Sequence, residues 1–407
     1  MESSPANRLS FATAAQLKRL QSFLTLPRET IPHLTSREAA SVLRDAGSRL
    51  GLQFIENKEI APTFLLLPAG AAPPIVTLFG TWHGEPSPTP AAAIDGAERL
   101  ALGAALAAVE AAAATGALGP PGEPRVAVVA APSAGAGSQG LDQLLLGHRE
   151  HLRADAAYWV RISPQPFPRR RRIFLGARGR LVIALRGGDA NPYRIRDQVV
   201  AELTESAYGP RPLDFELIRK LGQDRDAVAL LREHSPDPPG AARDGADLDS
   251  GPAAEERIRR ALFLPRGDVV IPAMTHPERP RAWLTFEIAE AMEPEPIAQR
   301  LESLSGGGRA ELVERFPWDR ANIHHPAAHA LIELAKARSE GPEIWPSAPW
   351  PGPSGLFTRA LGSGLFEWSI PLPAGAAFRL PKPAEFESIA LEIAELLLRV
   401  GPAPRSS

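Results

Sequence analysis

The stretch that decides the fold is Ile75-Val76-Thr77-Leu78-Phe79-Gly80-Thr81-Trp82-His83-Gly84-Glu85-Pro86. The apolar and β-branched residues at its start predict a buried strand over 75–79, and the glycines and proline that follow predict a loop. Residues 95–115 are rich in Ala and Leu and predict a long helix that ends before Gly116. A second strand at 125–131 follows, and strands that alternate with helices are typical of a parallel sheet covered on both faces.

The same alternation extends in both directions from this stretch. Upstream, helical periodicity predicts two helices with Ser10 and Ser36 as N-caps. Downstream, a helix and a strand are expected before residue 168, and the last helix closes the chain. These further elements are helices over 11–25, 36–50, 141–152 and 385–399 and strands over 63–68 and 156–160.

The character of the chain changes at about residue 168, which predicts an inserted domain. Strands are expected over 173–175, 179–185, 269–271, 283–288 and 310–315, with helices from Asn191-Pro192 to about 206 and over 294–303. Residues 234–255 are rich in Pro, Gly, Ala and Asp and predict a disordered loop. We therefore expect an α/β domain formed by 1–168 and 319–407, with an α+β domain inserted at 169–318.

Composition excludes several classes of protein. The 407 residues carry a formal net charge of −2, which gives no basic field for nucleic acid. There is no cysteine, so disulfides and thiolate metal sites are excluded and any metal would need His, Asp or Glu. The N-terminus lacks the pattern of a secretion signal, and no apolar tract predicts a membrane span. We expect a cytoplasmic protein with no nucleic-acid or membrane partner.

Several segments, in chain order, carry a family resemblance. Leu78–Pro86 resembles a Gly-His-x-Asp motif followed by proline, and Ala93–Gly96 resembles the tract of a metal-bridging aspartate. Val126–Gly140 resembles a strand with a Glu-Glu pair before Gly-Ser. Pro381–Phe386 resembles a His-x-Pro-Asn-Glu-Tyr motif. Further matching segments are Ala154–Ala156, Arg178–Arg180, 271–273, 283–288 and 293–298. Together they resemble the zinc aminoacylases, acetylornithine deacetylases, succinyl-diaminopimelate desuccinylases, carnosinases and related carboxypeptidases.

The resemblance implies a fold and a chemistry. The fold is a zinc-exopeptidase-like α/β domain, with a mostly parallel sheet flanked by helices, and an inserted α+β lid that often mediates dimerisation. Members of the family hydrolyse an amide with two bridged zinc ions, which polarise the carbonyl and activate a water, while a Glu takes its proton. Two His and three carboxylates hold the metals, and a further Asp orients the first His.

The residues at these positions in this chain are mostly unable to bind zinc. The first His falls on Thr81, its orienting Asp on His83, and the bridging Asp on Asp95, which is kept. The general base and the adjoining ligand fall on Ala134 and Gly135. The next carboxylate falls on Arg161 and the last His on Pro381.

A shifted alignment does not restore the ligands. Residues 126–140 contain no acidic residue, and residues 369–384 contain no His. The lid tract between Leu185 and Asn191, which carries a substrate-contacting His in the family, has none here either. The loss of the metal centre is therefore independent of register.

Two functional hypotheses follow. The first is a non-catalytic homologue with no expected cofactor, which binds a peptide, an acyl-amino-acid-like ligand, an anion or a protein partner, with a homodimer through the lid implied by the family. The second is an enzyme with a site rebuilt around His83 and Asp95, either with zinc or metal-free with His83 as base and Arg161 as anion holder. His83, Asp95 and Arg161 are the ligand-binding candidates. Asp95 is equally explained as a helix N-cap, and His83 as a polar residue at a strand end.

Other motifs have structural explanations beside functional ones. His324, His325 and His329 resemble a metal cluster but also fit the exposed start of a helix at Pro326. His148 and His151 are expected on the exposed face of another helix.

Gly135–Gly140 spells Gly-x-Gly-x-x-Gly, although a small anion beside Arg161 fits that place better than a dinucleotide. Arg169–Arg172 is interpreted as a solvated hinge or a charged patch that faces the other domain, and not as a nucleic-acid site.

Overall fold

A computed structural model of the chain describes residues 18, 32–57, 62–70, 72–82, 94–120, 122–132, 138–163, 170–207, 210–234, 251–272, 280–289, 294–338, 341–371 and 382–400. Contacts divide the chain into two compact units. The first unit is formed by Met1–Ile173, Ala321–Glu343 and Phe357–Ser407, and the second by Phe174–Arg320 and Ile344–Leu356. The segment Ile344–Leu356 thus groups with the inserted unit, beyond the single insertion that the sequence predicts.

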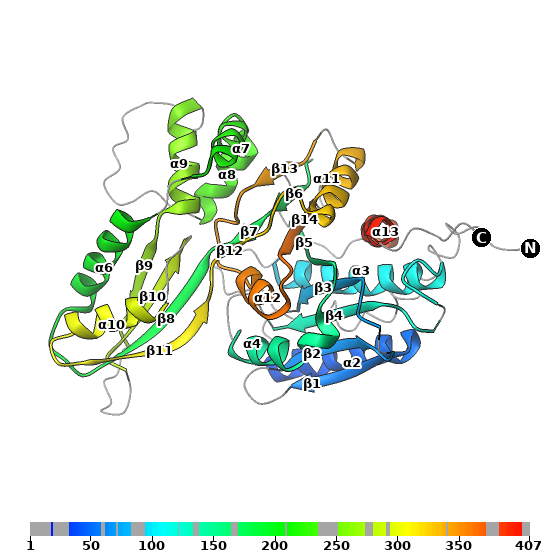
Figure 1. Cartoon of the computed structure of the whole chain (residues 1–407), viewed down its shortest axis with the longest axis horizontal. Coiled ribbons are helices and arrows are strands. Elements are labelled where there is room, and N and C mark those ends of the chain that lie inside the picture. Colours follow the sequence, from blue (N-terminus) through cyan, green and yellow to red (C-terminus); the bar gives the residue numbers. More distant parts are fainter. Residues whose placement is uncertain are drawn as a thin grey trace, which may run out of the picture. The chain divides into compact units, whose positions relative to one another are not determined.

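The first unit holds the large sheet and its helices (Figure 1). Its strands are β1 Leu52–Asn57, β2 Thr63–Pro68, β3 Val76–Thr81, β4 Val126–Ala131, β5 Ala156–Ser163, β6 Arg172–Phe174, β13 Glu343–Trp345 and β14 Leu365–Pro371. Its helices are α2 Pro32–Leu50, α3 Ile94–Ala114, α4 Ser138–Gly147, α5 Arg149–Leu152, α11 Pro326–Arg338, α12 Ser354–Leu361 and α13 Pro383–Val400. β6, β13 and α12 run across the division between the units.

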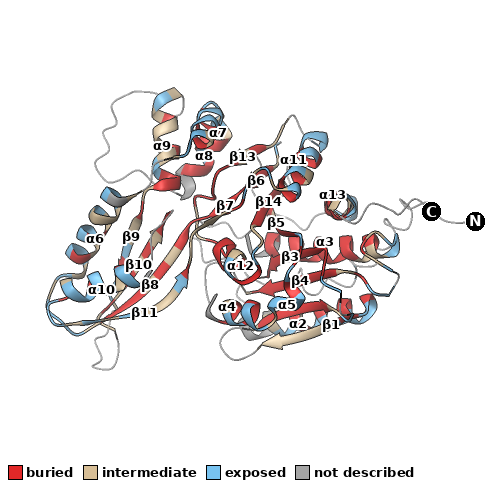
Figure 2. Ribbon diagram, in the orientation of Figure 1, coloured by how far each residue is buried: buried red, intermediate tan, exposed pale blue. Residues whose placement is uncertain are grey.

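The eight strands form one mixed sheet in the order β1-β2-β4-β3-β5-β14-β6-β13. β4, β3, β5 and β14 pair in parallel, while β1 with β2 and β2 with β4 pair antiparallel. Every residue of β3 and β4 is buried, as the red central strands of Figure 2 show. Such continuous apolar strands need cover on both faces. Phe79 and Gly80 show this cover, because the Phe79 ring meets Phe357 of α12 and Gly80 faces Leu102 of α3.

The register of the parallel strands brings three strand ends together. Phe79 of β3 pairs with Trp159 of β5, and Trp159 pairs with Glu367 of β14. Because side chains alternate between faces, Thr81 and Arg161, two residues farther along their strands, lie on the same face as Phe79 and Trp159. The carboxyl ends of parallel strands are where ligands bind in open α/β sheets.

The second unit contains a four-stranded antiparallel sheet in the order β11-β8-β10-β9. Its strands are β8 Gly179–Arg186, β9 Arg266–Val270, β10 Ala282–Ile288 and β11 Arg309–Phe316, and the short strands β7 Gly176–Ala177 and β12 Asp319–Arg320 pair separately. Burial alternates strictly along β10, which is the pattern of a sheet with one covered face. Helices α6 Pro192–Ser206 and α10 Pro294–Leu304 supply that cover through Ile195, Val199, Ile297 and Leu301.

A second apolar core in this unit was not predicted from the sequence. It is formed by α7 Pro212–Gly222, α8 Arg225–His234 and α9 Gly251–Phe263, packed with Phe174 and Trp345. The predicted disordered loop at 234–255 was wrong at both ends, because His234 closes α8 and α9 begins at Gly251; residues 235–250 lie outside the described part. α7 and α8 precede that polar loop, and no helices were predicted for them.

Other predicted boundaries also needed correction. α2 begins at Pro32, so Ser36 lies inside the helix and is not its N-cap. The helix expected over 141–152 is interrupted at His148, which separates α4 from α5. Asn191 does cap α6, because its side chain accepts a hydrogen bond from the Tyr193 amide at 2.9 Å. The predicted helix at 11–25 with Ser10 lies, apart from Lys18, outside the described residues.

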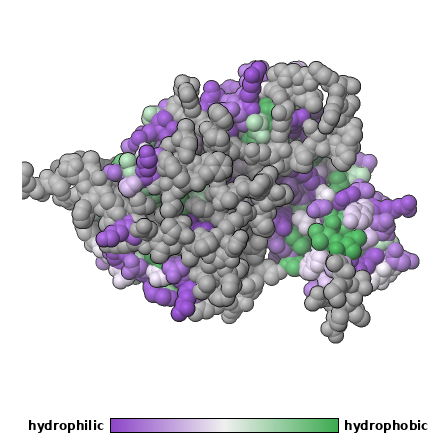
Figure 3. All heavy atoms as spheres, turned by 180° about the vertical axis from the view of Figure 1, so that it is seen from behind, coloured by the Kyte–Doolittle hydropathy of each residue, from purple (hydrophilic) through white to green (hydrophobic). Residues whose placement is uncertain are grey.

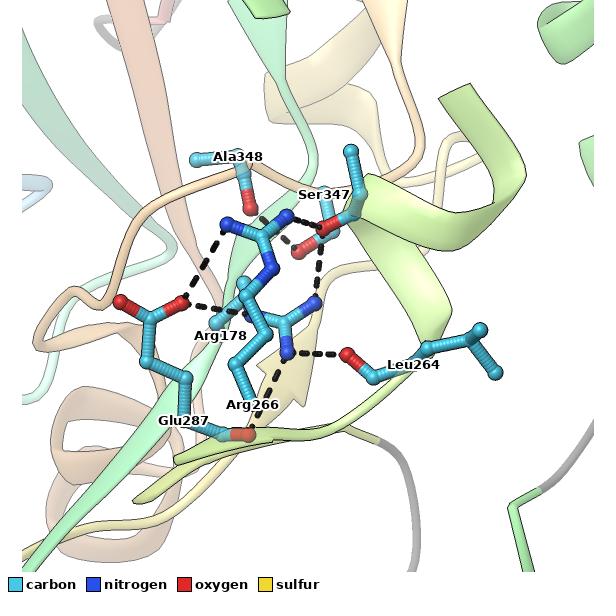
Figure 4. Close-up of polar contacts among 7 residues, drawn as sticks. Arg178, Leu264, Arg266, Glu287, Ser347 and Ala348 are labelled. Carbon is cyan, nitrogen blue, oxygen red and sulfur yellow. Dashed lines mark hydrogen bonds and ion pairs between the residues drawn. The ribbon is translucent and has the colours of Figure 1, made fainter. Parts of the chain in front are cut away.

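A buried charge cluster links the elements of the second unit. Arg178, just before β8, is fully buried and donates hydrogen bonds to the carbonyls of Ala261 at 2.7 Å, Leu264 and Glu287 at 3.3 Å. Figure 4 shows the guanidinium of Arg266 beside that of Arg178, both directed at the Glu287 carboxylate. Burial lowers the pKa of Arg178 to about 10, against the opposing pull of Glu287. Arg178 thus satisfies carbonyls at the end of α9 that the helix itself leaves without partners.

Replacement of Arg178 by Met is expected to destabilise the protein by about 3–5 kcal/mol, because Glu287 and the α9 carbonyls lose their buried partner. The free energy of unfolding from urea titration measures the effect. Arg186→Met is the matched control on β8, since its ion pair with Glu311 is exposed and worth at most about 1 kcal/mol. Equal losses for the two variants would contradict a structural role for Arg178.

Candidate functional site

The structure describes only part of the predicted site. Thr81 ends β3 and is 2% exposed, and Arg161 lies near the end of β5. Helix α3 begins at Ile94, so Asp95 lies in its first turn instead of at the N-cap, where a carboxylate also suits the positive end of the helix dipole. The Asp95 side chain and the positions His83, Ala134, Gly135 and Pro381 lie outside the described part, so their predicted roles stay predictions.

Arg161 is held between two buried carboxylates. Its Nε donates to Glu98 Oε1 at 3.2 Å, and one terminal nitrogen donates to Glu367 Oε1 at 3.0 Å. The other oxygen of Glu98 accepts the hydroxyl of Thr81. Glu98 is 7% exposed and Glu367 1%. We call these four residues the Arg161 network; it joins the end of β3, the last part of β5 and the middle part of β14 to the first turns of α3.

An aromatic group supports the network from within the sheet. The guanidinium carbon of Arg161 lies 4.9 Å from the centre of the Trp159 ring, a distance at which a cation is attracted to the ring face. Trp159 in turn packs edge-on against Phe79 at 5.4 Å between ring centres. Trp82, the residue after Thr81, is buried and stacks on Phe64 at 4.9 Å. The Trp159 ring, itself packed against Phe79, therefore restricts the direction of the Arg161 guanidinium.

Sequence reasoning identified Arg161 and Thr81 but missed Glu98 and Glu367. Glu367 carried a signal, because it is the one charged residue in the apolar strand Leu365–Pro371, whereas Glu98 lies next to Arg99 near the start of α3 and carried a weaker one. An acidic residue on a fully buried strand needs a cationic partner. The sequence alone does not say which arginine supplies it.

The charges of the network disfavour a metal ion. One guanidinium faces two carboxylates. A dication there would be repelled by Arg161, and the carboxylate oxygens that could bind it already accept hydrogen bonds. No group of three or more His, Asp or Glu suited to hold a metal occurs among the described residues. These residues do not fit a zinc centre.

The histidine group at the start of α11 has a structural role. The Nδ1 atom of His325 accepts a hydrogen bond from the Ala327 amide at 3.2 Å, and its ring packs on Phe366. His324 lies beside His329 with 6.4 Å between ring centres. His325 therefore caps the helix that Pro326 begins.

Two arginines of the run, Arg171 and Arg172, form ion pairs inside the first unit. Arg171 forms a two-point ion pair with the buried Glu392 of α13 at 2.7 and 2.8 Å, and Arg172 pairs with Glu343 of β13 at 2.7 Å. Arg172 is 2% exposed, so the expectation of a solvated hinge was wrong for this residue. Burial explains why: β6 lies inside the large sheet, and its charges need buried partners.

The described surface offers few large apolar side chains. Among the residues that are coloured in Figure 3, hydrophilic ones are widespread and the clearest apolar group lies at the right of the view. The most exposed large apolar side chains are Leu146, Tyr193, Phe215, Val270, Ile271 and Leu398, of which Val270 and Ile271 are adjacent at the end of β9. Among the helices that the structure describes, none has the length and apolar character needed to cross a membrane.

Comparison with solved structures identifies the fold. The metallo-carboxypeptidase Sso-CP2 of Sulfolobus solfataricus, of the M20 family, aligns with a TM-score of 0.67 over 95% of this chain and 98% of its own at 17% identity. The chain has the M20 metallopeptidase fold. The dipeptidase Dug1p of Saccharomyces cerevisiae covers 99% of both chains at a TM-score of 0.67 and 13% identity. Human carnosine dipeptidase 1 aligns at 0.62, with 12% identity and 97% of this chain and 98% of its own covered.

The M20 fold accounts for the large mixed sheet and the inserted lid domain, so the predicted fold class is confirmed. No family model and no characterised protein matches the sequence itself. Identities of 12–17% to the three solved structures above establish a shared fold and leave activity open. What this chain does must be argued from its own residues.

Arg161→Met is expected to destabilise the protein by about 3–5 kcal/mol, because Glu98 and Glu367 would then be buried without a cation. Arg161→Lys should recover part of that loss, since a lysine keeps the charge but cannot reach both carboxylates with a planar fork. Chemical denaturation measures both variants.

Arg359→Met is the matched control in the same unit. Its ion pair with Asp142 is long, 3.9 Å, and its side chain is 44% exposed, so a loss of at most about 1 kcal/mol is expected. If Arg161→Met cost no more than this control, the Arg161 network would not be a stabilising element.

Proposed function

We propose that this chain is a non-catalytic protein of the M20 metallopeptidase fold that binds a peptide or acyl-amino-acid-like ligand. The observation that carries the proposal is the fixed cation of Arg161, which is bound to Glu98 and Glu367. The sequence resemblance aligns Arg161 with a metal-binding carboxylate of the family. Amide hydrolysis by this family needs a metal-activated water and a carboxylate base. The aligned positions Ala134 and Gly135 provide neither.

The peptide-like ligand rests on similarity of fold. The solved structures that align over nearly the whole chain include a carboxypeptidase and two dipeptidases, whose substrates are peptides. Binding determinants and metal chemistry are separate functions of such a site, so recognition can persist after catalysis is lost. A protein partner and a homodimer through the second unit are compatible with this proposal, as is a cytoplasmic location, and each stays a prediction.

Metal content tests the loss of catalysis directly. Protein purified without chelator and then dialysed against zinc is expected to contain far less than one zinc ion per chain by elemental analysis. The unfolding midpoint should be unchanged by a chelator, because no group of three or more His, Asp or Glu among the described residues is suited to hold a metal. Two zinc ions per chain would overturn the proposal.

Ligand binding and turnover are separated with one panel of dipeptides and N-acyl amino acids. A bound member stabilises the folded state by about 2.7 kcal/mol at one hundred times its Kd, which is seen as a rise in the unfolding midpoint. No hydrolysis of the stabilising compounds is expected. The absence of stabilisation by any member would contradict the peptide-like ligand.

The competing function is a hydrolase with a site rebuilt around His83 and Asp95. It predicts turnover of a member of the panel that His83→Ala or Asp95→Ala abolishes while the unfolding midpoint is retained. Turnover that both variants leave unchanged would exclude this alternative and point to a contaminating enzyme.

A further inference from the structure

The Arg161 network has the form of an occupied cation site. Two buried carboxylates, from α3 and β14, bind one guanidinium, and the Thr81 hydroxyl of β3 donates a hydrogen bond to the Glu98 carboxylate. The guanidinium comes from β5, so four separate elements meet there. We propose that Glu98, Glu367 and Thr81 form a cation site whose permanent occupant is the guanidinium of Arg161, and that removal of this side chain leaves a site for free guanidinium-type cations.

The geometry selects a planar cation with several N–H donors. The contacts to the two carboxylates leave from different nitrogens of one guanidinium, Nε at 3.2 Å and a terminal nitrogen at 3.0 Å. The same group lies over the face of Trp159 at 4.9 Å. A guanidinium combines a donor fork with a flat face that stacks on an aromatic ring, whereas an ammonium is a compact point charge. The site is thus matched to the shape of its occupant as well as to its charge.

The charge balance supplies the driving force for such a ligand. With Arg161 in place, the network carries one positive and two negative charges. Without it, two carboxylates remain at positions that are 7% and 1% exposed, which is unfavourable unless a cation returns. The side chain of Arg161 is 26% exposed, so the vacated space is reachable from solvent.

The inference goes beyond the proposed ligand and does not depend on it. It assigns to Arg161 the structural role that a bound metal ion would have. Arg161 is a cation that links β3, β5 and β14 to the start of α3. A tethered guanidinium does this without metal supply. It also means that a metal ligand introduced at a single aligned position would not by itself create a metal site, because the positive charge of Arg161 would still repel the metal ion.

Chemical rescue of Arg161→Ala tests the proposal. Its unfolding midpoint is measured with guanidinium chloride at low millimolar concentration, far below the molar range in which this salt unfolds proteins. Potassium chloride and tetramethylammonium chloride at equal ionic strength control for salt and for a cation without N–H donors. Guanidinium alone is expected to stabilise the variant in a saturable way, with the folding equilibrium constant raised about tenfold at ten times its Kd.

The parent protein and Arg359→Ala, which alters an exposed arginine of the same unit, should show no such rise. If Arg161→Ala does not fold, Arg161→Ala/Glu367→Gln is used, because it removes one of the two unpaired charges and keeps Glu98 and Thr81 as acceptor and donor. In the variant that folds, equal midpoints in guanidinium and potassium salts would overturn the proposal. A saturable rise with guanidinium and none with tetramethylammonium would support it.

Discussion

The ion pairs of Arg161 with Glu98 and Glu367 are the constraint on which the centre of the first unit depends. Charged side chains removed from water are tolerated only when they are paired with good geometry. Here the pairing is possible because β3, β5 and β14 are neighbouring parallel strands in register, and α3 packs against β3 and β5. The central strands are otherwise apolar, and apolar packing alone does not determine how these charges are arranged. The Arg161 network determines the arrangement, because each carboxylate accepts a hydrogen bond from Arg161.

The same rule governs the rest of the molecule. Arg171 pairs with Glu392 and Arg172 with Glu343 beside β6, and the second unit uses Arg178 with Glu287 in the same way. In each case an arginine at a strand end joins elements distant in sequence. Buried arginines thus act as cross-links in a chain that has no cysteine.

Loss of the metal ligands and retention of the fold are compatible for a physical reason. A metal centre between strand ends neutralises carboxylates and ties the strands together, and a guanidinium held by two carboxylates can do both. The sequence resemblance aligns Arg161 with a metal-binding carboxylate, so this residue is expected to supply a positive charge as well as to remove a ligand. The M20 fold is found in this chain together with the Arg161 ion pairs.

The sequence by itself determined the alternation of strands and helices around Ile75–Pro86, the presence of an inserted α+β unit, and the lack of zinc-binding side chains at the aligned positions other than Asp95, because periodicity and residue chemistry are local properties. It did not reveal the core formed by α7, α8 and α9, whose short helices flank a polar loop. Only the tertiary structure decided which carboxylates hold Arg161, since Glu98 and Glu367 are 63 and 206 residues away from it in the chain. That choice depends on the register of β3, β5 and β14, which no local pattern encodes.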